Sequence, residues 1–418
     1  MRSVPNAPRP TRCLPFRWLA LVLIVGVARD PANARPFAFV ANQATGVITE
    51  INPTRKAVAE TVPLSLAYGL QAAKLNPQGT RLYVATDYGV SIVDTASGAV
   101  VDTIQSTLEP GPCRGNCLGA ALDLTPDGTS LYLITATPYP DVGYFAVTVI
   151  DTTSQQVVAA IPVEKVPQAV VIASDGHAYV ATTDAPYSLT VIDTESRAVV
   201  ATIPLDLPAW TLAVAPDARE VYAATVDARS SYIEVVETGT QTVTARIPVP
   251  RTATGLAVTP DGHTIYVATY GAIVVVDVAT RQVAATIPAA RPEQVAVSRD
   301  GGFAYVTDYD AGALRVVDTS TNALVDTIPL GPIPATIAVS PDGGRLYVLP
   351  PWGPSAVWAI DTRSRRVDVL APSASSLDSV VLSPDGHRAY VLNTAYSDTV
   401  FIVDTSSDML IKRIPLDG

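Results

Sequence analysis

The residues best suited to chemistry in this sequence are aromatic side chains that stand near carboxylates. Of the seventeen tyrosines, eight repeat at one position of a Val-rich motif, and the other nine fall in connections between predicted strands. A ring flanked by carboxylates can hold a sugar, a peptide or a cationic group through stacking or cation–π contact. The candidate ligand-binding residues are therefore Tyr88, Tyr139, Tyr144, Tyr187, Trp210, Tyr232, Tyr270, Tyr309, Trp352 and Tyr396. The alternative is packing, because an aromatic near a strand end can cover the edge of the next sheet.

The three histidines do not point to catalysis. His177, His263 and His387 each follow a Gly in an Asp-Gly-His turn, so they occupy equivalent positions of separate repeats and should not converge. Without a convergent His, Ser-His-Asp and Cys-His catalysis lack their general base. The sequence also has no Gly-rich phosphate loop and no dinucleotide-binding fingerprint. We therefore predict no catalytic residues and no cofactor.

Two short patterns raise the question of a metal ion or a disulfide. Asp308-Tyr309-Asp310 brings two carboxylates into one loop, but Ca²⁺ takes six or more oxygen ligands, so we predict no metal site. Cys113 and Cys117 stand close together in CRGNC, and an even, close pair in an oxidising compartment predicts a loop-stapling disulfide. The alternative is half of a metal site, although no His or further Cys lies nearby to complete it.

The elements that must position these residues recur along the chain. In each repeat a first strand, such as GLAVTP at 255–260, runs into a turn of the Pro-Asp-Gly type. These turns lie at 76–79, 126–128, 174–176, 216–218, 260–262, 299–301, 341–343 and 384–386. Each turn is followed by a strand with a Tyr, a Val/Ile-rich strand ending near Asp-Thr, and a strand ending near Ile-Pro. Four short strands in units of about 40–45 residues are typical of a β-propeller. We predict an all-β chain with one propeller of four-stranded antiparallel blades; a β-sandwich array or solenoid is the alternative.

The strand count allows two numbers of blades. Residues 36–64 supply three strands, PFAFVAN, GVITEIN and AVAETVP, and eight full units follow from about residue 66. Either eight blades close the ring and the three N-terminal strands form an incomplete unit beside it, or the ring has nine sectors, one of them incomplete. We favour eight blades.

The repeat resembles a known family. Its Tyr-containing strand reads YVAT at 83–86, 179–182 and 266–269, YVTD at 305–308 and YVLN at 390–393. These strands, within the pattern PDG…YVAT…VxVVDxxTxxVxATIP, resemble the YVTN-type β-propeller repeat family over residues 36–418. The resemblance implies a propeller in an exported or cell-surface protein, and it supplies no catalytic motif.

The N-terminal segment predicts export. Residues 1–34 combine four arginines ahead of an apolar run, the run itself (WLALVLIVGVA at 18–28) and a small-x-small site at Ala32-Asn33-Ala34. Together these features indicate a signal peptide before a propeller domain at 35–418. An uncleaved anchor is the alternative, but the apolar run is shorter than the ~20 residues that a spanning helix needs. We expect no membrane insertion after cleavage, and a periplasmic, cell-surface or secreted location. A formal net charge of −11 makes nucleic acid an unfavourable partner.

Strand direction gathers the candidate rings on one face. In an antiparallel blade, the connections between strands two and three and the junctions between units emerge together, opposite the Asp-Gly turns. Loops on a rigid scaffold commonly carry function. We therefore expect a non-catalytic scaffold that binds a protein, a peptide or a glycan at the cell envelope. The alternatives are a propeller enzyme of the lactonase or quinone-dependent dehydrogenase type, or a structural protein of the envelope or surface layer.

Overall fold

The structure is a computed structural model that describes residues 38–42, 47–52, 57–63, 72–77, 80–86, 89–94, 100–105, 121–137, 144–227, 230–331, 333–340, 343–350, 355–373, 377–382, 388–393, 399–404 and 409–415. Side chains outside this description include those of residues 38–73, 136–144 and 370–415. Every regular element among the described residues is a β-strand, and no helix there is long and apolar enough to cross a membrane.

One blade shows how the repeat folds. Its strands are β20 (Ala253–Val258), β21 (Thr264–Thr269), β22 (Ala272–Asp277) and β23 (Gln282–Pro288), paired antiparallel in that order. The turn after β20 is closed by the Gly262 N–H, which donates to the Thr259 carbonyl at 2.8 Å. Gly262 has φ of +75°, a conformation that costs glycine little. The turn after β22 is held by the carboxylate of Asp277, which accepts from the Thr280 N–H at 2.7 Å.

The other strands form seven more four-stranded sheets and one three-stranded sheet. The three-stranded sheet holds β1 (Ala38–Asn42), β2 (Val47–Asn52) and β3 (Ala57–Pro63). Four four-stranded sheets lie between the three-stranded sheet and β20 along the chain. The first two hold β4 (Ala72–Leu75), β5 (Arg81–Thr86), β6 (Gly89–Asp94) and β7 (Val100–Gln105), and then β8 (Leu122–Leu124), β9 (Ser130–Thr137), β10 (Tyr144–Asp151) and β11 (Gln156–Pro162). The next two hold β12 (Pro167–Ile172), β13 (His177–Thr182), β14 (Ser188–Asp193) and β15 (Ala198–Pro204), and then β16 (Ala209–Val214), β17 (Glu220–Val226), β18 (Ser231–Glu237) and β19 (Thr242–Val249). The sheets after β23 are β24 (Pro292–Val297), β25 (Phe303–Asp308), β26 (Ala313–Asp318), β27 (Ala323–Pro329); β28 (Thr336–Val339), β29 (Arg345–Leu349), β30 (Ser355–Asp361), β31 (Val367–Ser373); and β32 (Leu377–Leu382), β33 (Arg388–Asn393), β34 (Thr399–Asp404), β35 (Met409–Pro415).

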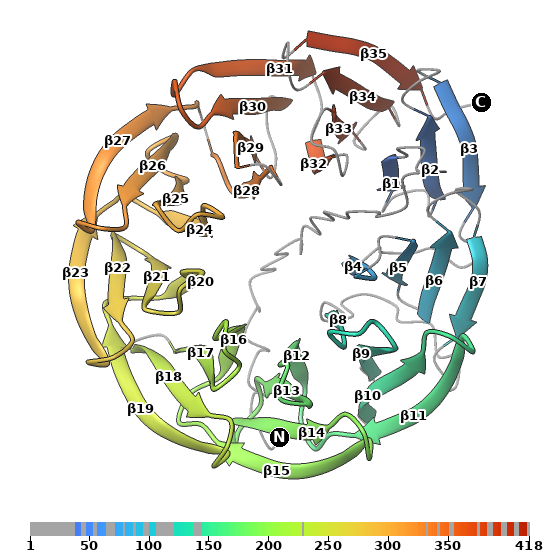
Figure 1. The fold of residues 1–418 in the computed structure, drawn as a ribbon, viewed down its shortest axis with the longest axis vertical. Helices are drawn as coiled ribbons and strands as arrows, with labels where there is room; N and C mark the ends of the chain where they lie inside the picture. Colours follow the sequence, from blue (N-terminus) through green and yellow to red (C-terminus); the bar gives the residue numbers. More distant parts are fainter. Residues whose placement is uncertain are drawn as a thin grey trace, which may run out of the picture.

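The sheets stand side by side in a ring, so the predicted all-β propeller is confirmed (Figure 1). The first strand of each four-stranded blade lies nearest the ring axis and the fourth lies on the circumference (Figure 1). The three-stranded sheet fills a sector between β32–β35 and β4–β7, and β1 lies against β32 and β33 (Figure 1). The favoured closure, eight blades with the three N-terminal strands beside the ring, is not the one observed. The structure has nine sectors, the first of them incomplete, because β1 packs against the last blade.

The core lies between neighbouring blades. The second and third strands are buried along most of their length, as in β21 and β22, whereas the circumferential strands are exposed except at one Ile near their end. The repeated Tyr of strand two is almost inaccessible in Tyr83, Tyr132, Tyr179, Tyr222, Tyr266, Tyr305 and Tyr347. These rings are therefore core residues, and the first six of them belong to the apolar clusters that seal neighbouring blades against each other.

Candidate functional site

The face of the ring that carries the strand two-to-three loops and the unit junctions is called the junction face below. Of the ten aromatic residues predicted to bind a ligand, Tyr187, Trp210, Tyr232, Tyr270 and Tyr309 lie on it with described side chains. Tyr144 begins β10, but its side chain lies outside the described residues. Tyr88, Tyr139, Trp352 and Tyr396, and the predicted disulfide pair Cys113 and Cys117, also lie outside the described residues.

Several aromatic and acidic side chains of the junction face surround Arg291. This residue lies in the junction between β23 and β24, and its guanidinium carbon is 4.3 Å from the ring centroid of Tyr309 and 5.3 Å from that of Tyr270. Both distances are within the range of cation–π attraction. Arg291 Nε is also 2.8 Å from Glu293 Oε1, and Nη1 is 4.0 Å from Asp310 Oδ1. Two tyrosine rings and two carboxylates therefore surround a cation, and this cation is a side chain of the protein itself.

Glu293 gives this cluster an unusual acid. It is the second residue of β24, and its side chain is only 4% exposed. Burial disfavours the charged form and raises the pKa of Glu293 to about 7, although Arg291 acts in the opposite direction. A carboxyl that titrates near neutral pH can hold or release a proton under ordinary conditions.

Close approach of two inner strands explains that burial. A Cβ at Gly255 on β20 would lie 2.8 Å from the Glu293 carbonyl oxygen, a distance that real side chains do not reach. Only glycine at this position lets β20 and β24 meet so closely. The backbone that carries Glu293 is therefore pressed against the preceding blade.

Asp308 fixes the loops around Arg291. Its buried carboxylate accepts from the N–H groups of Ala290 and Arg291 at 3.0 and 2.8 Å. It also accepts from Arg315 Nε at 3.0 Å. The two carboxylates of the Asp308-Tyr309-Asp310 pattern thus have different roles: Asp308 is enclosed in the loop, whereas Asp310 is exposed beside Arg291.

A second arginine–tyrosine pair lies one blade earlier. The guanidinium carbon of Arg246 on β19 is 5.4 Å from the ring centroid of Tyr232 on β18. Arg246 pairs with Asp206 and, at 3.3 Å, with Glu234, whose side chain has no exposed area. Burial raises the pKa of Glu234, and Arg246 opposes this effect. This pair lies within the blade, because Glu234 and Arg246 are direct cross-strand neighbours.

The remaining described candidates differ in exposure. Tyr187 is half-buried and packs against the hydrophobic core between its own blade and the next, so its ring serves packing. Trp210, the second residue of β16, is 48% exposed. Arg251, in the junction before β20, is also exposed, and its guanidinium lies against Gly271 of the Tyr270–Gly271 turn.

These side chains follow one another around three successive blades. We call the set Trp210, Arg251, Tyr270, Arg291 and Tyr309 the arginine–aromatic arc. Trp210 lies on the inner strand β16, Arg251 precedes the neighbouring inner strand β20, and Arg291 precedes β24, which lies against β20. The arc offers an exposed indole, two guanidinium groups and two tyrosine rings on one side of the ring.

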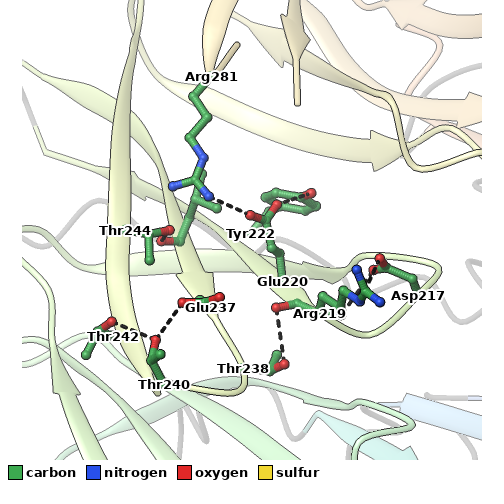
Figure 2. A network of polar contacts seen from close by, with 11 residues as sticks. Asp217, Arg219, Glu220, Tyr222, Glu237, Thr238, Thr240, Thr242, Thr244 and Arg281 are labelled. Carbon is green, nitrogen blue, oxygen red and sulfur yellow. Dashed lines mark hydrogen bonds and ion pairs between the residues drawn. The ribbon is translucent and has the colours of Figure 1, made fainter. Parts of the chain in front are cut away.

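The opposite face carries polar contacts that join blades. Arg281 of one blade donates to Glu220 of the preceding blade at 2.9 Å, and the hydroxyl of Tyr222 donates to the other oxygen of Glu220 at 2.7 Å (Figure 2).

His177 also lies between two blades, with Nδ1 3.2 Å from Asp175 and Nε2 3.5 Å from Gln241 of the next blade. His263, by contrast, is 78% exposed. Where it is described, this face has side chains that hold neighbouring blades together.

No group of three or more His, Cys, Asp or Glu side chains that could hold a metal ion occurs among the described residues. The described histidines, His177 and His263, lie on the face opposite the arc, in different blades. His387 lies outside the described residues.

Sequence reasoning identified the rings of the arc but did not identify its arginines. Charged residues at a repeat position that is Val or Thr in other blades could have indicated this cluster. Strand three carries Glu234 and Arg315 at the position that Thr190 and Val274 occupy in two other blades. Charges in an otherwise Val-rich buried strand require partners, which here are Arg246 of β19 and Asp308 at the end of β25.

Tyr232 shows a smaller departure. It was expected in a connection, but it lies within β18, paired with Thr225 of β17. Tyr144 likewise belongs to β10. Both strands extend further toward the junction face than the repeat motif suggested.

Comparison with known proteins supports the fold. No protein-family model matches this chain, and no curated protein sequence matches it. Among solved structures, the chain is similar to dihydro-heme d1 dehydrogenase NirN in complex with DHE, with a TM-score of 0.61, 16% identity, and coverage of 84% of this chain and 76% of that one. It is also similar to hydrazine synthase of Kuenenia stuttgartiensis, with a TM-score of 0.52, 19% identity, and coverage of 73% and 96%. At these identities the likeness establishes the propeller fold alone.

Proposed function

We propose that this protein is an exported, non-catalytic binding scaffold of the YVTN-repeat type, and that it takes a glycan or protein partner on the arginine–aromatic arc. The observation that carries the proposal is the stack of Tyr270, Arg291 and Tyr309 across two blades, with the half-exposed Trp210 on the same face. Rigid aromatic rings supply contact area at a small entropic cost. Arginines held by their own carboxylates present donors in a fixed direction.

The arc has the features expected of residues that dominate the binding energy of a partner. Asp308 fixes the backbone of Arg291, so the guanidinium is positioned before a ligand arrives. Trp and Arg are among the residues that most often dominate binding energy. The remaining polar groups of the arc provide hydrogen bonds that orient the partner.

A glycan array and a peptide array, each followed by calorimetric titration of the best probe, test the proposal. Trp210→Ala should weaken binding roughly 30-fold, as expected for a hot-spot residue worth about 2 kcal/mol. Val325→Ala, on the outer strand β27, removes a side chain of similar exposure (49%) and should leave affinity unchanged. Equal affinities of the wild type and Trp210→Ala would contradict the proposal.

A second candidate function is an enzyme in which Glu293 exchanges a proton with a bound substrate. The observation that favours it is the buried Glu293 carboxyl, 4% exposed and 2.8 Å from Arg291 Nε, whose burial raises its pKa to about 7. The similar solved structures include a dehydrogenase and a synthase, which accords with an enzymatic role. Lactone hydrolysis and dye-coupled oxidation assays, run with the wild type and Glu293→Gln, distinguish the two functions. An activity that Glu293→Gln abolishes, while binding of the best probe persists, would establish the enzyme.

A further inference from the structure

We propose that Arg251 is the subsite of the arc that binds a ligand carboxylate, and that the ligand is an acidic glycan whose sugar rings pack along Trp210 and Tyr270. This inference rests on the proposed binding function of the arc and assigns its ligand class.

Arg251 differs from the other arginines of the junction face in its partners. Arg246, Arg291 and Arg315 are each paired with one or two carboxylates of the protein. Arg251 is exposed and makes no hydrogen bond or ion pair with any residue that the structure describes. Its positive charge is therefore the one on this arc that the described neighbours leave uncompensated.

The backbone holds Arg251 in a defined position. It follows Pro250 and has φ of +63°. The next residue, Thr252, accepts from the N–H of Tyr270 at 3.1 Å, which ties this junction to the Tyr270–Gly271 turn. A Cβ at Gly271 would lie 3.6 Å from Cζ, Nε and Nη1 of Arg251, so the guanidinium rests over this glycine. Part of the entropy that a free side chain would lose on binding is therefore already lost.

The Tyr270–Gly271 turn is bordered by two guanidinium groups. Arg291 lies over the Tyr270 ring, and Arg251 lies against Gly271. Arg291 keeps its carboxylates, Glu293 and Asp310, while Arg251 remains open to a ligand. A fork of guanidinium donors matches the two oxygens of a carboxylate.

Local charge favours a carboxylate over a phosphate. Asp310 is 57% exposed beside Arg291, and the whole chain has a formal net charge of −11. A phosphate group would bring up to two negative charges toward these carboxylates, whereas a carboxylate brings one. One uncompensated guanidinium can balance one such charge.

The aromatic neighbours favour a sugar over a peptide. Trp210 stands half-exposed on β16, the inner strand next to β20, whose preceding junction carries Arg251. A flat indole next to a charged donor suits a chain of rings that bear carboxylates at regular intervals. An acidic peptide would need only the charge, so it should be indifferent to Trp210.

The test uses the full-length protein and three probes: tetragalacturonate, its fully methyl-esterified form, and an oligoglutamate of similar length. We expect tetragalacturonate to bind and the methyl ester, which has the same rings without the charge, to bind about 10-fold more weakly. Arg251→Gln should reduce the affinity for tetragalacturonate by the same factor and leave that for the ester unchanged. Arg219→Gln, on the opposite face with a side chain 85% exposed, is the matched control and should have no effect.

Each other outcome overturns a stated part of the inference. Equal binding of the acid and its ester, with sensitivity to Trp210→Ala, would refute the carboxylate subsite and leave the proposed function intact. Binding of oligoglutamate that depends on Arg251 but not on Trp210 would replace the glycan with an acidic peptide. Failure of every probe, together with empty glycan and peptide arrays, would refute the proposed function itself.

Discussion

At the scale of single residues, the carboxylates of the junction face differ in how far hydrogen bonds and ion pairs compensate their burial. Glu293 and Asp308 lie on neighbouring strands of one blade, yet they are stabilised differently. Asp308 accepts hydrogen bonds from three backbone N–H groups and an arginine, whereas Glu293 is contacted by Arg291 and is otherwise desolvated. The first is suited to fixing a loop, and the second to changing its protonation state.

Glu293 should make the protein less stable as the pH rises. Its folded-state pKa of about 7 lies above the ordinary value of 4.5, so between these values the folded protein keeps a proton that the unfolded chain releases. The free energy of unfolding therefore falls as the pH rises across this window, by at most about 3 kcal/mol. Glu293→Gln should remove this part of the pH dependence, measured from thermal midpoints between about pH 4.5 and about pH 8. Asp310→Asn, at an exposed carboxylate, is the control; parallel profiles of the wild type and Glu293→Gln would contradict the prediction.

Asp308 should contribute more to the free energy of unfolding than Thr269, which occupies the equivalent position of the preceding blade. Thr269 ends strand two of the preceding blade and donates one hydrogen bond, to the Ala272 carbonyl at 2.9 Å. Asp308→Ala leaves Arg315 and three backbone donors without their acceptor, which should cost about 3 kcal/mol. Thr269→Ala should cost about 1 kcal/mol. Thermal unfolding of both variants, and of Asp308→Ala combined with Arg315→Ala, checks this; the double variant should recover part of the loss.

Residue patterns in the sequence were informative where they repeat and uninformative where partners come from another blade. The packing of Tyr266 and its equivalents could be predicted because β-branched and aromatic residues recur at a fixed spacing. The position of Arg291 between Tyr270 and Tyr309 could not, because it depends on how two blades face each other. The rings of the arc were found from their spacing, but their cation was missed for this reason.

At the scale of elements, the turn between strands three and four connects neighbouring blades. Its last residue has positive φ in Gln155, Arg197, Gln241, Arg281, Asn322 and Arg365. Several of these side chains reach the preceding blade: Asn322 accepts from the Tyr266 hydroxyl at 2.6 Å, Arg281 donates to Glu220, and Arg365 lies over the ring of Phe303. The Asp-Thr motif thus closes its own hairpin and also presents a side chain that joins two blades.

The contact between Asn322 and Tyr266 should behave as one shared interaction. Asn322→Gly keeps the positive φ without strain but removes the acceptor, and Tyr266→Phe removes the donor. Each change should lower the unfolding free energy by about 1 kcal/mol, and the combined variant should lose little more than either alone. A thermal double-mutant cycle measures this. Fully additive losses would show that the two groups stabilise the protein independently.

At the scale of the whole molecule, the two faces of the ring have separate tasks. The Asp-Gly and Asp-Thr turns, with their regular hydrogen bonds, gather on one face and serve cohesion between blades. The irregular junctions gather on the other face, where Arg251 and Arg291 break the repeat. The repeats predict the structure of the first face well, because the same turn residues recur in each unit. For the junction face they predict only where binding residues lie, since its specificity comes from residues that occur once.

The three-stranded N-terminal sheet should stabilise the closed ring. The strand count alone left eight blades or nine sectors open, because pairing within units does not reveal which sheets become neighbours. In the structure, β1 lies against β32 and β33, so the three-stranded sheet covers a face of the last blade (Figure 1). A variant beginning at Leu64 lacks this sheet and should unfold at least about 5 °C below a variant beginning at Arg35, because apolar surface between blades becomes exposed. Equal thermal midpoints of the two variants would instead mean that eight blades close the ring and that β1–β3 are dispensable for its stability.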